Sequence, residues 1–144
     1  MSENITGDGI VKRLTSDSGR EYSNPEIHIL DKAKCGLVAG QRMLIPTLAD
    51  IEAALPRLSR GAVTSEKAFR ALVAEPFGAD GCCTFATNKA LRAITEGACA
   101  QLAAGVSEGD VPPFWRVVTA GSTIAKRLHL DAAFLSELLH QDVR

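Results

Sequence analysis

The chain has 144 residues, of which 46% are hydrophobic and 23% are charged. This length and composition predict one folded domain with its own core, and they exclude a chain that is disordered throughout. The formal net charge is −1, so the chain has no overall attraction to nucleic acid, and any DNA contact would require a local basic face.

No apolar run approaches the roughly 20 residues that a membrane span requires. The first residues are polar and lack the apolar core of a secretory signal, so we expect a cytoplasmic protein that makes no membrane contact. The cysteines match neither a zinc-finger spacing nor a CxxC redox motif; they are Cys35, Cys82, Cys83 and Cys99. We therefore expect reduced, mostly structural thiols, and neither a metal site nor a cofactor.

Residues 1–42 are predicted to form a partly ordered extension, because they are rich in turn-forming residues. Short strands are expected at Ile10–Leu14 and Glu26–Leu30. A regular pattern begins at Met43, where Thr47 is a good N-cap for a first helix that ends near Arg60-Gly61. Its apolar face is predicted to consist of Leu48, Ile51, Ala54, Leu55 and Leu58.

A second helix is predicted over residues 65–74, capped by Thr64 or Ser65, and a turn over residues 80–83. The inward residues of this second helix are expected to be Ala68, Leu72 and Val73. A third helix should begin near residues 84–87 and end near Ala104. The apolar stripe expected on this third helix is Ala90, Leu91, Ile94, Ala98 and Leu102.

Residues 105–113 are predicted to form a loop, followed by a strand over Phe114–Val118 and a turn at Gly121-Ser122 that suits a wing hairpin. Asp131 should cap a last helix, with Phe134, Leu135, Leu138 and Leu139 on one side. Helices, a turn and a β-ribbon in this order are typical of a helix-turn-helix with a wing. We predict an α+β winged-helix domain over residues 43–144.

Residues 112–118 read Pro-Pro-Phe-Trp-Arg-Val-Val. This segment resembles Pro-Cys-His-Arg-Val, the active-site motif of the O6-alkylguanine-DNA alkyltransferases. Phe114 stands where that family has its acceptor cysteine, and Trp115 stands where it has its histidine. A thiolate is the nucleophile in that chemistry, and a phenyl ring cannot replace it. The resemblance implies an alkyltransferase-type fold without a catalytic residue.

Two further motifs are similar to a group of alkyltransferase-like proteins. Met43-Leu-Ile-Pro-Thr-Leu48 matches Met-Leu-Ile-Pro-[ST]-[PL]. Residues 78–87 are similar to Gly-Ala-Asp-x-x-Cys-Pro-x-Thr-[TA], with Thr84 at the proline position and Ala86 at the threonine position. Arg60-Gly-Ala-Val-Thr64 also resembles the segment that precedes the helix-turn-helix in alkyltransferases. The resemblance covers about residues 40–142, and it implies non-catalytic DNA binding.

The chain departs from that family at two positions that read DNA. Glu66 stands near the position of the family's tyrosine. The family has an arginine in the recognition helix that fills the gap left by a flipped base, and here that region reads Thr87-Asn-Lys-Ala90, with Lys89 and Arg92 as its only cations. The C-terminal segment keeps Leu138-Leu139 but lacks the family's Glu-Gly ending. These departures weaken an expectation of damaged-base recognition and leave the expectation of DNA binding.

The candidate DNA contacts lie on the two predicted helices of the helix-turn-helix and beside the motif. Lysines and arginines would contact phosphates, and Asn88 could read adenine in the major groove. The predicted set is Lys67, Arg70, Asn88, Lys89, Arg92 and Arg116. Arg116 has a structural alternative, an ion pair. Phe114 and Trp115 would occupy the former base pocket, Phe114 as a filler and Trp115 as a core residue or a base-stacking residue.

The predicted function is non-catalytic binding of double-stranded DNA, in repair or transcription regulation. The first alternative is a protein-interaction module that has kept the fold without binding DNA, and a protein partner could also bind residues 1–42. The second alternative is an enzyme that uses Cys83 at a helix N-terminus, which requires an unusually acidic thiol. No histidine lies near Cys83 in the sequence to act as its base.

Overall fold

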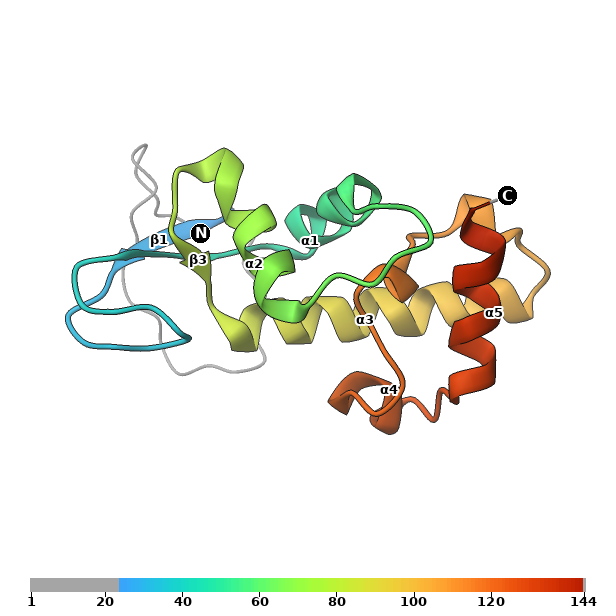
Figure 1. Ribbon diagram of the computed structural model, residues 1–144. Coiled ribbons are helices and arrows are strands. Elements are labelled where there is room, and N and C mark those ends of the chain that lie inside the picture. Colours follow the sequence, from blue (N-terminus) through green and yellow to red (C-terminus); the bar gives the residue numbers. More distant parts are fainter. Residues whose placement is uncertain (1–23, 144) are drawn as a thin grey trace.

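The structure, a computed structural model, describes residues 24–143. The strand predicted at Ile10–Leu14 lies outside them. Figure 1 shows a small sheet at one end of the molecule, a long helix running away from it, and two shorter helices at the far end. The domain is α+β, as the sequence predicts.

The sheet joins the predicted extension to the predicted domain. Strand β1 (Glu26–Ile29) pairs antiparallel with β2 (Arg42–Ile45), from Glu26 opposite Ile45 to Ile29 opposite Arg42. Strand β3 (Gly81–Cys82) pairs parallel with β2 on its other side. The strand predicted at Glu26–Leu30 is thus confirmed, whereas the turn predicted at residues 80–83 is wrong because Gly81 and Cys82 join the sheet.

Helix α1 (Leu48–Ala54) begins at the predicted N-cap. The Thr47 hydroxyl accepts a hydrogen bond from the Asp50 N–H at 3.2 Å, and the Asp50 carboxylate accepts one from the Thr47 N–H at 2.8 Å. The α-helix ends earlier than predicted and continues as the 3-10 turn Leu55–Arg57. Pro56 explains the change, since a proline inside an α-helix lacks the N–H and clashes with the preceding turn.

Helix α2 (Glu66–Ala74) is capped by Ser65, as predicted. Its buried residues are Phe69, Val73 and Ala74, whereas Ala68 is exposed and Leu72 is half-buried. A 3-10 turn (Glu75–Phe77) and β3 separate α2 from the next helix. This connection is longer than the three- or four-residue turn of a helix-turn-helix.

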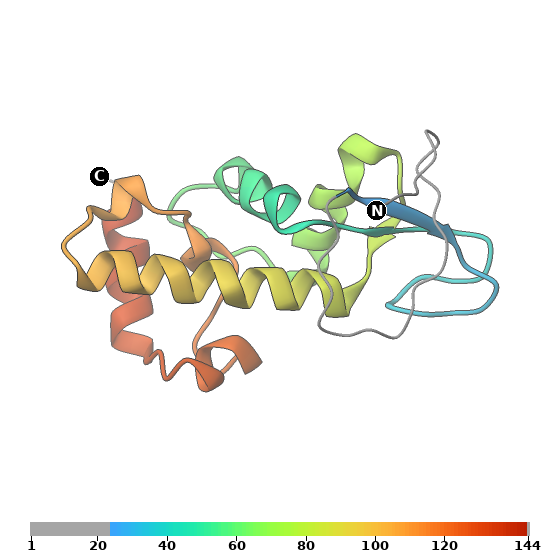
Figure 2. The same cartoon turned by 180° about the vertical axis from the view of Figure 1, so that it is seen from behind.

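Helix α3 (Thr84–Ala103) is the longest element and confirms the predicted third helix. Four of the five predicted stripe residues are buried, and Leu102 is half-buried; the buried four are Ala90, Leu91, Ile94 and Ala98. Helix α1 packs against α3, and α2 packs against β3. The side view from behind shows the N-terminal end of α3 beside the sheet and its C-terminal end beside α5 (Figure 2).

The predicted strand at Phe114–Val118 and the predicted wing are wrong. Residues Phe114–Arg116 form a 3-10 turn, and the N–H groups of Val117 and Val118 bond back to the Phe114 carbonyl at 3.1 and 2.8 Å. Ser122 is the N-cap of helix α4 (Thr123–Arg127), which the sequence analysis did not predict. Another short 3-10 turn, Glu108–Asp110, precedes the motif.

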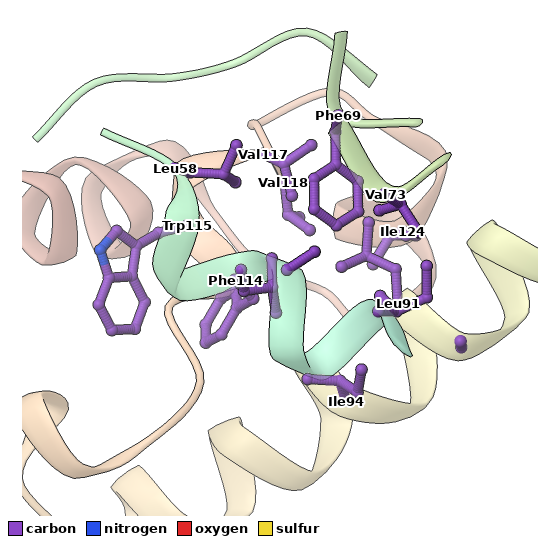
Figure 3. Packing of buried hydrophobic residues seen from close by; sticks show 14 of the residues in the cluster. Leu58, Phe69, Val73, Leu91, Ile94, Phe114, Trp115, Val117, Val118 and Ile124 are labelled. Carbon is purple, nitrogen blue, oxygen red and sulfur yellow. The ribbon is translucent and has the colours of Figure 1, made fainter. Parts of the chain in front are cut away.

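Helix α5 (Ala132–Asp142) is capped by Asp131, as predicted. Leu135 and Leu138 are buried, and Phe134 and Leu139 are half-buried. The main core therefore lies between α1, α2, α3, the motif segment and the two last helices (Figure 3). Within residues 24–143, no helix combines the length and the apolar character that a membrane crossing requires.

Candidate nucleic-acid interface

Phe114 and Trp115 are core residues. They are 0% and 2% exposed, and their rings meet edge to face with centroids 5.2 Å apart. Figure 3 shows Phe114 among the apolar side chains of α3 and the motif segment. Of the two interpretations of Trp115, the structure shows the core one. The position of the family's acceptor cysteine is therefore buried among apolar side chains.

Arg116 is buried and its guanidinium is occupied by protein groups. Its Nε and Nη2 atoms donate to the two carboxylate oxygens of Asp142 at 2.9 and 2.8 Å. Nη1 donates to the Leu58 carbonyl at 3.2 Å. The structure therefore shows the ion pair, and the prediction that Arg116 contacts DNA phosphate is wrong, because the side chain is only 10% exposed.

Asp142 lies at the centre of a buried polar cluster that also contains Arg116 and the Gly61 N–H. Hydrogen bonds from Arg116 hold the pKa of its carboxyl below the usual value despite burial, and the Gly61 N–H, at 2.6 Å, acts in the same direction. The indole N–H of Trp115 is buried without a hydrogen-bond partner among residues 24–143. The cluster ties the motif, the end of α5 and Gly61 together.

The adjacent cysteines, Cys82 and Cys83, are free thiols that pack in different parts of the core. Cys82 belongs to the main core, and its thiol donates to the Arg70 carbonyl at 3.3 Å. Burial raises the pKa of Cys82 to about 12, and burial also raises the pKa of Cys83. Both are therefore protonated at neutral pH, which is the opposite of the acidic thiol that a Cys83-dependent enzyme requires.

The N-terminal half of α3 presents polar side chains to solvent. Asn88 and Lys89 are exposed, and Arg92 is half-buried one turn later. Residues 81–95 contain two cations, Lys89 and Arg92, and no Asp or Glu. The positive end of the helix dipole lies at the same place. This end of α3 is therefore locally electropositive although the whole chain is not.

A second basic segment, residues 31–42, lies beside the start of α3 and is not among the DNA contacts predicted from the sequence. The Thr84 N–H donates to Cys35 Sγ at 3.3 Å, which fixes the loop to the helix. This segment contains Lys32, Lys34 and Arg42 against a single Asp31. Its excess of cations is visible in the sequence, but its position is not, because it depends on a contact 49 residues along the chain.

Lys67 and Arg70 lie on α2. Lys67 is exposed, and Arg70 is half-buried. The bond from Cys82 Sγ to the Arg70 carbonyl places this turn of α2 next to the residues that enter α3. We call residues 31–42, Lys67, Arg70 and residues 81–95 the basic end. Glu66 and Glu75 on either side of these two cations limit its charge, and Asp80 lies at its edge, where it accepts a hydrogen bond from the Arg42 N–H at 2.8 Å.

A shallow, open hollow of about 330 Å³ lies at the other end of α3, lined by Cys99, His129, Leu130, Asp131 and Phe134. The part of the chain that the structure describes contains no group of side chains suited to hold a metal ion. The hollow does not adjoin Phe114, where the resemblance placed a base pocket.

The chain matches no family model, no curated protein and no solved structure at a significant level. The similarity to alkyltransferases therefore rests on the sequence motifs alone, and the fold is described from its own elements.

Proposed function

We propose that this chain is a non-catalytic DNA-binding protein of the alkyltransferase-like type, acting in DNA repair or transcription regulation. In this proposal α3 is the helix that contacts DNA, in an α+β domain whose residues 24–143 form no wing hairpin. The observation that carries the proposal is the basic end, where three separate segments bring cations together around the N-terminus of α3.

Each group of the basic end has a defined role in the proposal. Asn88 faces base edges, where an amide side chain can both donate and accept hydrogen bonds. Lys89 and Arg92 on α3, with Lys67 and Arg70 on α2, contact phosphates and fix the orientation of the duplex. The proposal includes no alkyl transfer, because a buried phenyl ring, that of Phe114, stands at the position of the family's acceptor thiol.

The proposal predicts salt-sensitive binding that does not distinguish a lesion. Fluorescence anisotropy of a labelled duplex, with and without one O6-methylguanine, should give similar affinities at about 50 mM salt and a steep loss of affinity by about 200 mM, because phosphate neutralisation releases counterions. Absence of binding at low salt would contradict the proposal and favour the protein-interaction module. A preference for the lesion would indicate a repair sensor.

A matched pair of variants localises the contact. Lys89→Gln with Arg92→Gln removes two charges from the basic end, and should reduce the slope of log affinity against log salt by about 2. Lys126→Gln with Arg127→Gln removes the same charge from α4, away from the start of α3 (Figures 1 and 2). This control should bind as the native protein does.

A further inference from the structure

The side chain of Phe85 is exposed to solvent. It is 76% exposed, more than any other exposed large hydrophobic side chain within residues 24–143, and those others are all aliphatic. Isolated exposed aliphatic residues are ordinary on protein surfaces. An aromatic ring that could bury an area of roughly 150–250 Å² is a stronger candidate for a contact with a partner.

The backbone beneath Phe85 is rigidly mounted. Phe85 is the second residue of α3, and its neighbour Thr84 is fixed by the bond from its N–H to Cys35 Sγ. The Cys83 N–H donates to the Leu44 carbonyl in β2 at 2.8 Å, and Ala86 packs on the small cluster formed around Met43. These contacts hold the opposite side of α3 against the sheet, so Phe85 is on the side of the helix that faces solvent.

The surroundings of Phe85 on the helix are polar and cationic. Asn88 and Lys89 are three and four residues later, and Arg92 is seven residues later, so the four side chains share one face. An apolar protein partner would require a contiguous apolar patch around the ring, and this face does not offer one. A phenyl ring among amide and cationic groups complements duplex DNA, which combines anionic phosphates with apolar base faces.

We propose that Phe85 enters the base stack of bound DNA as an apolar wedge and unstacks one base step. Proteins that bind the minor groove and bend DNA insert phenylalanine, leucine or similar side chains in this way, so in this mode the face of α3 that carries Phe85 enters the minor groove. The wedge rests on the proposed function, and it adds a distortion of the duplex that phosphate contacts alone do not produce. Neighbouring Lys89 and Arg92 would hold the backbone on either side of the opened step.

The test uses the full-length chain and a duplex that contains 2-aminopurine, whose fluorescence rises when the base is unstacked. The native protein should raise this fluorescence at saturation. Phe85→Ala should bind about 5- to 150-fold more weakly, the equivalent of one stacking contact, with an unchanged salt slope and no fluorescence rise when saturated. Phe85→Leu should preserve the rise, because leucine also acts as a wedge.

Leu48→Ala is the matched control, since Leu48 is an exposed apolar residue at the start of α1. It should behave as the native protein does. An equal fluorescence rise with Phe85→Ala, or binding of the native protein without any rise, would overturn the wedge while leaving DNA binding in place. Absence of native binding would overturn both proposals. If Phe85→Ala does not bind, loss of the rise in Phe85→Leu would overturn the wedge.

Discussion

Arg116→Ala is expected to lower the free energy of unfolding by about 3–5 kcal/mol, because it leaves the Asp142 carboxylate buried without its partner. Chemical denaturation followed by circular dichroism measures this change. The matched control is Arg57→Ala, which breaks the exposed ion pair between Arg57 and Glu75. That change should cost less than about 1 kcal/mol. Equal effects of the two variants would contradict a structural role for Arg116.

The same pair gives the native protein a dependence of stability on pH. The pKa of Asp142 is lower in the folded state than its ordinary value of 3.8, so the unfolded chain binds a proton more readily. The stabilisation that the Arg116–Asp142 ion pair gives the folded state is complete above pH 3.8 and is lost as pH falls through the folded-state pKa of Asp142. Native protein and Asp142→Asn should therefore differ most in melting temperature near neutral pH, and the difference should shrink only as pH falls below 3.8 and through the folded-state pKa. A constant difference would contradict the account.

Phe114→Ala is expected to lower the free energy of unfolding by about 3–5 kcal/mol, through lost burial and the cavity that remains. Phe85→Ala removes the same group from an exposed position and should change stability by no more than about 0.5 kcal/mol. Thermal and urea unfolding of both variants provide the comparison. If Phe114→Ala unfolds like the native protein, Phe114 does not fill the core as the structure shows it.

The helix starts could be predicted because their signals are local. Thr47, Ser65 and Asp131 each bond an N–H within their own first turn. The sequence predicts Thr47 and Asp131 as caps, and it leaves Thr64 and Ser65 as alternatives for α2. The stripe of α3 followed from spacing alone, since one face of a 20-residue helix must be buried. The strand expected at Phe114–Val118 and the turn expected at Gly121-Ser122, in contrast, predicted a wing hairpin that residues 24–143 do not form.

The errors arose where distant contacts decide the structure. Residues 114–118 are buried throughout, and a continuous apolar run does not separate a strand from a 3-10 turn. Ser122 follows a glycine, a pairing that suits a hairpin turn as well as the helix cap that it forms. Strand β3 has two residues and depends on pairing with β2.

The candidate site was predicted in part. Asn88, Lys89 and Arg92 do lie together on one helix, but the basic loop beside them was missed because Cys35 and Thr84 are 49 residues apart. Arg116 had two open interpretations in the sequence, since its partner Asp142 lies 26 residues away. The exposure of Phe85 could not be predicted from the sequence, because the helical spacing of apolar residues does not show which of them remains in solvent.

The central claim is that the basic end binds duplex DNA. The most direct measurement is a titration of the ¹⁵N-labelled full-length chain with an unmodified duplex at low salt, followed by amide chemical shifts. The account predicts shifts concentrated in residues 31–42 and 81–95, with the amides of α5 unchanged. Shifts confined to α4 and α5, or no shifts at all, would contradict it.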